Sequence, residues 1–403
     1  MSRDFFRLLA AGTVSNFGSM LTALALPLAA IQLLHATPGQ IAALNVAAIV
    51  PGFALGLFAA DAIDRVRRRP VLVVADLARA VLLVSVPAAA FAGVLTMSHL
   101  VAFAFCRGLF DFGFEVAEQA LLPALVAPAD LVRANGRLQA GDSSAEAFGF
   151  AVGGWLVQWF SAPVALLIDA ASYLASAVLI TRIRTPEPAP APGGRRAAEL
   201  FAGVREIARV PALRGVAAAG MLATAAAQMV GAVYMLFAFR ELGFGAGVIG
   251  VLASAGAVAS LGSALLADRL PERLAGRPAM VAGLALYALG PLVLSAAPGP
   301  TLIGVAAIVA QQVVGDGGYV LYEVHQRSLR QRITPGRLLG RVGGALRLLN
   351  GAAVLAGAAA GGWVGESLGL RATLVAGACV SALAAVAAAA VGRAAQNRQP
   401  SPA

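Results

Sequence analysis

The chain has 403 residues, of which 59% are hydrophobic and 12% are charged, whereas a typical soluble domain is about half apolar and a quarter charged. This composition excludes a soluble globular enzyme, a secreted disulfide scaffold and a disordered protein. A transmembrane helix needs ~20 apolar residues, so the about 238 apolar residues would supply about twelve helices. The apolar runs do not alternate with polar residues, which argues against a membrane β-barrel.

Long apolar segments follow one another along the whole chain, separated by short polar loops. Prolines stand at or near the start of several segments, where the missing N–H of proline is tolerated. We therefore predict twelve membrane-spanning helices, at residues 8–34, 39–60, 71–95, 99–120, 141–160, 163–181, 211–239, 246–267, 278–297, 301–324, 342–365 and 370–391.

The net charge of +10 comes from 30 basic residues, all of them arginine. Most of these arginines lie in alternate loops, on the side of both termini and of the central linker. By the positive-inside rule, we expect both termini to be cytoplasmic and the protein to be a multi-pass protein of the cytoplasmic (inner) membrane. The arginines are not interleaved with stacking aromatic residues, so we expect no nucleic-acid partner.

Short motifs recur in the same order in the two halves of the chain. Phe114-Glu115-Val116 recurs as Tyr322-Glu323-Val324, and the glycine-rich segment Gly149–Trp155 recurs as Gly357–Trp363, both 208 residues on. Repeats of this kind predict duplicated halves, a transporter architecture in which substrate binds between the halves near the midplane. We expect a six-helix half at residues 1–184, a cytoplasmic linker at 185–209, and a second six-helix half with a short cytoplasmic tail at 210–403.

The central linker begins Thr185-Pro-Glu-Pro-Ala-Pro-Ala-Pro and continues Gly-Gly-Arg-Arg196. A segment that is rich in proline and then in glycine is typical of a semi-extended tether. We therefore expect Thr185–Arg196 to lack a fixed structure.

Three segments carry a family resemblance: Gly12–Gly18 in the first helix, Ala60–Pro70 between the second and third helices, and Leu329–Val342 between the tenth and eleventh. With them the chain resembles the major facilitator superfamily, and more closely its drug, macrolide and siderophore (enterobactin-type) exporters. The resemblance implies an all-α polytopic membrane protein with twelve transmembrane helices in two pseudo-symmetric six-helix halves.

The Ala60–Pro70 segment contains a carboxylate beside a run of arginines. In the family, such a charge-assisted contact ties one helix pair to another in one conformation and releases it in the other. The resemblance thus implies a gating latch; the alternative is that the arginines only fix the topology. The latch candidates, including the second-half copy, are Asp64, Arg65, Arg68, Asp268 and Arg269.

The fourth predicted helix carries Arg107, Asp111, Glu115 and Glu118, whose spacing places all four on one helix face. Charges inside a membrane face the bundle interior or a water-filled cavity. Arg107 resembles the arginine that the family links to proton coupling. We expect proton coupling at Arg107, Asp111 and Glu115, while a static ion pair or contact with substrate remains an alternative. Glu118, nearer the cytoplasmic end, is expected to be solvated.

Further polar residues lie within the predicted helices. Asp76 and Arg79 are three residues apart and are expected to form a local pair. The segment Gly149–Gly154 resembles the antiporter motif of drug exporters, with close helix packing as the alternative. The candidate cavity residues are Asn16, Asn45, Gln228, Gln312, Asp316 and Glu323.

The leading hypothesis is a secondary active transporter that exports a small amphipathic molecule of the drug, antibiotic or siderophore type by alternating access and proton antiport. Alternatives are the same fold carrying a lipid, such as a lysophospholipid, or working in uptake; an integral membrane transferase is a remote alternative. We expect a monomer whose partners are a small-molecule substrate, protons and membrane lipids. No catalytic residues are expected, because no second acidic cluster accompanies Asp111 and Glu115 as a magnesium-dependent transferase would need. No cofactor or metal is expected, since the three histidines and two cysteines have no ligand spacing.

Overall fold

The computed structural model describes residues 2–58, 66–127, 130–187, 196–267, 270–271, 273–335 and 338–396. Every described regular element is a helix, as predicted. The chain forms two compact units: Met1–Gly194 with Phe244–Ala257, and Arg195–Gly243 with Val258–Ala403. The four latch candidates Asp64, Arg65, Asp268 and Arg269 lie outside the described residues.

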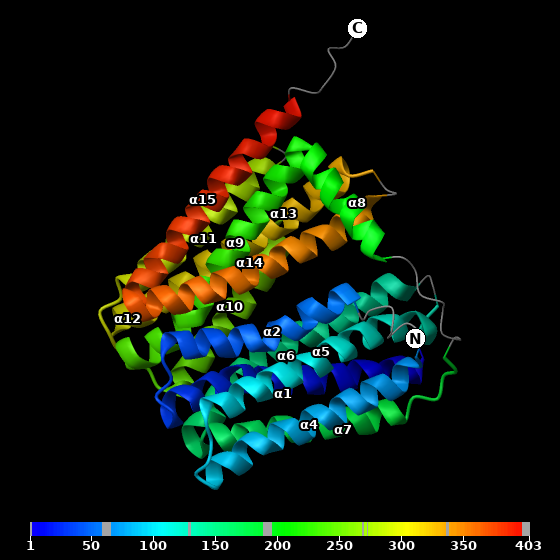
Figure 1. The fold of residues 1–403 in the computed structure, drawn as a ribbon, viewed down its shortest axis with the longest axis vertical. Coiled ribbons are helices and arrows are strands. Elements are labelled where there is room, and N and C mark those ends of the chain that lie inside the picture. Colours follow the sequence, from blue (N-terminus) through cyan, green and yellow to red (C-terminus); the bar gives the residue numbers. More distant parts are fainter. Residues whose placement is uncertain are drawn as a thin grey trace. The chain divides into compact units, whose positions relative to one another are not determined.

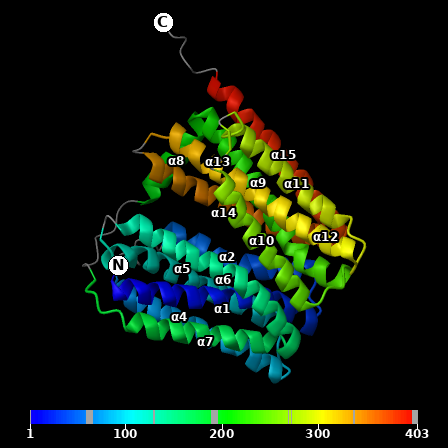
Figure 2. The same ribbon diagram turned by 180° about the vertical axis from the view of Figure 1, so that it is seen from behind.

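Unit 1 contains the first six long helices. Its element bounds are α1 Arg3–Leu33, α2 Pro38–Phe58, α4 Arg68–Phe91, α5 Met97–Leu125, α6 Leu131–Phe160 and α7 Ala162–Thr181. Helix α1 packs against α6 and α7, α4 packs against α5 and α7, and α2 packs against α5. Figures 1 and 2 show α4 and α7 side by side in both views.

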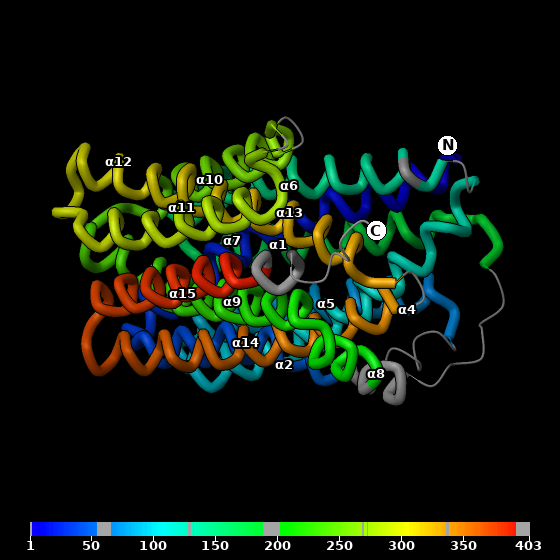
Figure 3. Tube along the Cα trace, turned by 90° about the horizontal axis from the view of Figure 1, so that it is seen from above, coloured from blue at the N-terminus to red at the C-terminus, as the bar shows by residue number. Residues whose placement is uncertain are grey.

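Unit 2 repeats this order. Its elements are α9 Pro211–Leu236 with the π-helical turn η2 Phe237–Glu241, α10 Ala246–Ala267, α11 Arg277–Ser295, α12 Leu302–Ala310 with η3 Gln311–Asp316 and α13 Gly317–Ile333, α14 Leu339–Ser367, and α15 Leu370–Gln396. Helix α9 packs against α14 and α15, and α11 packs against α13 and α15, as Figure 3 shows for α14, α9 and α15. The first part of α10 belongs to unit 1.

Four helix pairs of unit 1 correspond to pairs of unit 2 along the predicted repeat, whereas α2–α5 is matched by no closely packed α10–α13 pair among the described residues. The α1–α6 and α1–α7 pairs of unit 1 match α9–α14 and α9–α15 of unit 2, and α4–α5 and α4–α7 match α11–α13 and α11–α15. The prediction of two pseudo-symmetric six-helix halves is thereby confirmed.

The recurring glycine motif has the same structural role in both units. In unit 1 an added Cβ at Gly149 or Gly153 would meet Met20 or Leu21 of α1, and in unit 2 one at Gly357 or Gly361 would meet the backbone of α9. Glycine is needed here because any larger residue would push the paired helices apart. Close helix packing, the alternative reading of this motif, therefore has direct support in the structure.

Nine helices among the described residues are long and apolar enough to cross a membrane, and the shorter apolar segment Pro38–Ala54 belongs to α2. The remaining two long helices, α5 and α6, carry several charged residues. Several helices also run past the predicted apolar segments; α6, for example, begins at Leu131. Hydropathy detects only the apolar part of a helix, so it misses polar turns at the ends.

Part of the predicted linker is helical. Helix α8, Arg196–Arg209, packs against α14 and α9. Its Ile207 lies in an apolar cluster with Leu213 of α9 and Val342 and Leu346 of α14. This helix follows a Pro/Gly-rich segment, so composition averaged over the whole linker concealed it.

The start of the linker is held in place, contrary to the expectation for Thr185–Arg196. The carboxylate of Asp4 accepts hydrogen bonds from the backbone N–H groups of Arg184 and Thr185, at 2.9 and 2.8 Å. The carboxylate of Glu187 accepts from the backbone N–H groups of Arg68 and Arg69, at 2.6 and 3.1 Å. Glu187 thus caps the N-terminus of α4, where a negative charge is favourable.

Candidate functional site

A buried ion cluster lies inside unit 1, centred on Arg79 of α4. The guanidinium of Arg79 donates to Asp76, one turn earlier, at 2.5 Å and to Asp111 of α5 at 3.1 Å. The side chains of Arg79 and Asp76 are only 5% and 0% exposed. Because an unpaired charge in such an environment is costly, Arg79 is held where it can meet both carboxylates.

Two aromatic rings complete the surroundings of Arg79. Its guanidinium carbon lies 4.3 Å from the ring centroid of Phe114 on α5 and 4.4 Å from that of Tyr173 on α7. At these distances the ring faces attract the cation. The cluster therefore joins α4, α5 and α7 through one arginine.

Arg107 and Asp111, two of the predicted coupling residues, are brought together. The Nε atom of Arg107 lies 3.2 Å from Asp111 Oδ2, and the Asp111 side chain is 40% exposed. Asp111 thus bridges the two guanidinium groups of Arg79 and Arg107. It is also the accessible carboxylate of the cluster, whereas Asp76 is enclosed.

A third carboxylate of the region, Asp169 of α7, is fully buried. It accepts hydrogen bonds from the hydroxyl groups of Thr22 on α1 and of Ser172, the latter at 3.0 Å. Arg107 is close enough to interact with it electrostatically. Three carboxyl groups, those of Asp76, Asp111 and Asp169, thus interact electrostatically with only two guanidinium groups, those of Arg79 and Arg107.

Tyr173 connects this cluster to α1. Its hydroxyl lies 2.9 Å from the Ser19 hydroxyl, and Arg107 is close enough to interact with it electrostatically. The residue is completely buried. Tyr173 and Asp169 therefore tie the charged face of α5 to both α7 and α1.

The structure separates Glu115 from this cluster. Glu115 is exposed, and its carboxylate accepts a hydrogen bond from Gln119 at 3.3 Å. Glu118, expected to be solvated, instead lies against α1, where an added Cβ at Gly12 would be 3.1 Å from its carboxylate. It interacts electrostatically with Asp142 of α6, which accepts a hydrogen bond from Asn16 at 2.5 Å.

The other predicted cavity residues are divided between the units. Asn45 is half-buried on α2 of unit 1, and Gln228 is half-buried on α9 of unit 2. In unit 2, the Gln312 amide donates to the Tyr234 hydroxyl at 3.1 Å. Asp316 ends the π-helical turn η3, and Glu323 forms an ion pair with Arg327 at 2.9 Å on the exposed side of α13.

Unit 2 has no counterpart of the charged cluster at the repeat-related positions. At the offset of 208 residues, Arg107 corresponds to Gly315, Asp111 to Tyr319 and Asp169 to Gly377. Tyrosine rings pack there instead: the ring centroid of Tyr319 lies 5.2 Å from that of Tyr287 and 6.1 Å from that of Tyr322. The duplicated halves thus share a fold but differ in chemistry.

Comparison with known proteins identifies the family. The model of the Major Facilitator Superfamily matches residues 8–321. The chain belongs to the Major Facilitator Superfamily. It is therefore a multi-pass membrane protein and a transporter, and transporters of this superfamily bind small-molecule substrates.

Two relatives extend over nearly the whole chain. The uncharacterized MFS-type transporter y4rN of Sinorhizobium fredii (strain NBRC 101917 / NGR234) is 28% identical over 391 residues, covering 95% of this chain and 93% of the relative. The uncharacterized MFS-type transporter YfiS of Bacillus subtilis (strain 168) is 26% identical over 388 residues, covering 91% and 88%.

Solved structures of the superfamily share the fold. The nucleoside transporter NupG aligns with a TM-score of 0.80 at 14% identity, covering 97% of this chain and all of that one. A bacterial homologue of the iron transporter ferroportin, in an inward-facing state, aligns with a TM-score of 0.75 at 17% identity, covering 96% and 99%. At these identities the likeness concerns the fold alone.

The sequence did not reveal the roles of Tyr173, Asp169 and Glu187. Asp169 was visible as an isolated carboxylate in an apolar helix, and that is a signal of function inside a membrane. Tyr173 and Glu187 carried no such signal, because their partners lie more than a hundred residues away along the chain.

Proposed function

We propose that this transporter exports a small amphipathic molecule across the cytoplasmic membrane by alternating access, in exchange for protons. The observation that carries the proposal is the charged cluster of unit 1, in which Asp76, Asp111 and Asp169 share two guanidinium groups. One carboxyl group is thereby left without full charge compensation, and a carboxyl group in that situation binds a proton.

Asp111 is the carboxyl group best placed to exchange that proton. It is accessible, whereas Asp76 and Asp169 are enclosed, and it bridges Arg79 and Arg107. When Asp111 is protonated, its charge no longer holds either guanidinium. Arg107, which already lies near Asp169, is then held mainly by the Asp169 carboxylate. Protonation at one position thus changes the pairing between α4, α5 and α7.

Arg107 and Glu115 keep supporting roles in the proposal. Arg107 is the cation that responds to Asp111, and Glu115 is an exposed carboxylate on the same helix. The cargo is proposed to contact the uncharged polar residues Asn16, Asn45, Gln228 and Gln312 together with Asp316 and Glu323. Asp64, Arg65, Arg68, Asp268 and Arg269 are proposed as the gating latch.

Transport assays in cells and in liposomes test the proposal. Cells that express the protein are loaded with the uncharged dye Nile red, and its efflux is followed with and without a protonophore. We expect faster efflux than in cells with an Asp111→Asn variant expressed at the same level, and loss of the difference with the protonophore. Accumulation of a panel of amphipathic compounds by the expressing cells, with no efflux of any, would show that the direction is uptake.

A further inference from the structure

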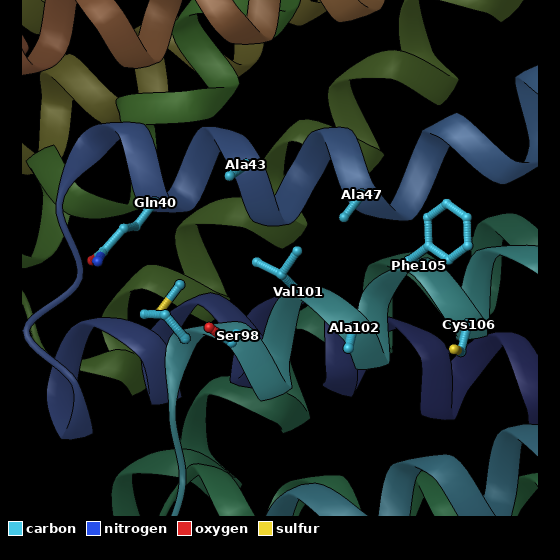
Figure 4. A pocket seen from close by; sticks show the side chains of 9 residues that line it. Gln40, Ala43, Ala47, Ser98, Val101, Ala102, Phe105 and Cys106 are labelled. Carbon is cyan, nitrogen blue, oxygen red and sulfur yellow. The ribbon is translucent and has the colours of Figure 1, made fainter.

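A groove separate from the charged cluster lies between α2 and α5 in unit 1, with a volume of about 510 Å³. Figure 4 shows Gln40, Ala43 and Ala47 on α2 facing Ser98 and Phe105 on α5. Ligand pockets for drug-sized molecules have volumes in this range. The groove shares no residue with the Arg79–Asp111 cluster.

Most of the groove is apolar. Ala43, Ala47 and Ala102 form walls of small side chains, and Val101 and Phe105 line the α5 side. Small residues leave room for a ligand body, and Phe105 presents a ring that is 42% exposed. This part of the groove suits a flat hydrophobic or aromatic body, because an aromatic ring stacks on such a surface.

One end of the groove is polar. Thr37 and Gln40 form a reciprocal cap at the start of α2: the backbone N–H of Thr37 donates to Gln40 Oε1 at 2.9 Å, and the backbone N–H of Gln40 donates to Thr37 Oγ1 at 3.3 Å. The cap uses the oxygen of the Gln40 amide, so its NH2 group is oriented to donate. Ser98, in the first turn of α5, adds a hydroxyl at the same end.

The N-termini of α2 and α5 both lie at this polar end, since Gln40 and Ser98 belong to their first turns. The partial positive charge of a helix N-terminus favours an electron-rich atom nearby. The polar end therefore offers donors and positive potential to an acceptor oxygen, and the rest of the groove offers an apolar surface.

None of the described residues that line the groove is charged. A phospholipid headgroup would find no arginine there to pair with its phosphate, and a cationic drug would find no carboxylate. The neighbouring titratable side chain, His99, is engaged with Ser85 at 3.1 Å. Charge complementarity thus selects an uncharged ligand.

We propose that the α2–α5 groove binds an uncharged amphipathic small molecule, with its aromatic or aliphatic body along Ala43, Ala47 and Phe105 and a carbonyl, ether or hydroxyl oxygen at Gln40 and Ser98. The proposal concerns binding and does not depend on the direction or the coupling of transport.

Cys106 provides a probe of occupancy, because it lines the groove and the chain contains one other cysteine, Cys379 on α15. The full-length Cys379→Ser variant is alkylated with N-ethylmaleimide with and without Nile red. Nile red is uncharged and aromatic and carries a carbonyl oxygen. We expect Nile red to slow alkylation of Cys106 at least fivefold, and to leave Cys379 unaffected in the matched Cys106→Ser variant.

Substitutions in the groove test the two ends separately. Gln40→Leu removes the donor and should raise the Nile red concentration needed for protection by roughly tenfold, the effect of one hydrogen bond of typical strength. Ala43→Trp fills the apolar part and should abolish both protection and saturable binding of Nile red followed by its fluorescence. Val81→Trp, at a 72% exposed position of α4, is the control and should bind as the parent does.

Unchanged alkylation of Cys106 in the presence of Nile red would refute the proposal, as would full protection in the Ala43→Trp variant. If palmitoyl-oleoyl-phosphatidylglycerol added to the detergent-solubilised protein protects Cys106 as well as Nile red does, a lipid tail occupies the groove and the proposal is wrong. Binding without transport would leave this site in place and contradict only the proposed export.

Discussion

The carboxylate of Asp111 on α5 lies 3.1 Å from the guanidinium of Arg79 on α4, and the Arg79 side chain is only 5% exposed. The two residues are 32 positions apart in the sequence. Their contact joins two neighbouring helices of unit 1 through a buried charge, and Phe114 and Tyr173 cover that charge with their rings. Arg79 therefore contributes to the stability of unit 1 and also contacts Asp111, the residue proposed to couple transport to protons.

Replacing Arg79 should destabilise the protein severely. Arg79→Met leaves the enclosed Asp76 without its cation, and breaking a buried pair in this way costs about 3–5 kcal/mol. The apparent melting temperature of the detergent-solubilised protein measures the loss. The control is Arg327→Met, whose partner Glu323 lies in an exposed pair and whose removal should cost within about 1 kcal/mol. Equal melting temperatures for the two variants would contradict the structural role of Arg79.

The glycines at the α9–α14 crossing should not tolerate a side chain. Gly357→Ala places a Cβ against the backbone of Ala225, and overpacking of this kind costs about 1–3 kcal/mol. Gly343→Ala on the same helix is a matched control, because nothing lies within 4 Å of its added Cβ. Thermal unfolding of both variants should show a loss only for Gly357→Ala; a loss of equal size in Gly343→Ala would point to helix α14 in general.

Glu187 should protect the first turn of α4 from hydrogen exchange. Its carboxylate accepts hydrogen bonds from the N–H groups of Arg68 and Arg69, and loss of a capping side chain costs about 1 kcal/mol. Glu187→Ala should therefore speed exchange at these amides roughly fivefold, measured by mass spectrometry of peptides covering the start of α4. Asp130→Ala is the control, since Asp130 stands at the N-cap of α6 without a capping hydrogen bond.

The fold could be predicted from the sequence because long apolar segments can be satisfied in a membrane only as helices. The repeat of Gly149–Trp155 as Gly357–Trp363 also marked the duplication, and the corresponding helix pairs bear it out. Helix α8 was missed, since its amphipathic pattern is short and follows a segment without helical character.

The candidate site could be predicted only in part. Periodicity placed Arg107 and Asp111 on one face of α5, because helix geometry is local. It could not show that Arg79 reaches Asp111 from another helix, so Asp76 and Arg79 appeared to be an isolated pair. The same periodicity placed Glu115 and Glu118 with the other charges. In the structure the two residues differ: Glu115 is exposed, whereas Glu118 is partly buried against α1.

The orientation of the protein in the membrane can be tested by reporter fusions. Most arginines lie on the side of the N-terminus and of the linker, so a fusion after Arg184 should report the cytoplasm. A fusion after Gly299, in the turn between α11 and α12, should report the opposite side. If both fusions report the same side, the number of membrane crossings between them is even and the predicted topology is wrong.

The coupling role of Asp111 can be separated from a purely structural role. Asp111→Asn keeps the shape of the side chain and one acceptor oxygen, but it removes the negative charge and cannot bind and release a proton. In liposomes with an imposed pH gradient, this variant should lose gradient-driven transport of Nile red, while exchange of labelled for unlabelled dye without a gradient should persist. A structural role alone would lower both activities together.

Glu115→Gln provides the matched comparison on the same helix. Glu115 is exposed and contacts Gln119, whereas Asp111 bridges two arginines. We therefore expect Glu115→Gln to keep most gradient-driven transport, with any decrease below about twofold, an energetic difference of less than about 0.5 kcal/mol. Loss of coupling in Glu115→Gln with normal coupling in Asp111→Asn would exchange the roles of the two carboxylates. Normal gradient-driven transport by the double variant would exclude both carboxylates. The protonated group would then have to be sought at Asp169, which is buried and bonded to Thr22 of α1, or at Glu118, which is partly buried beside α1.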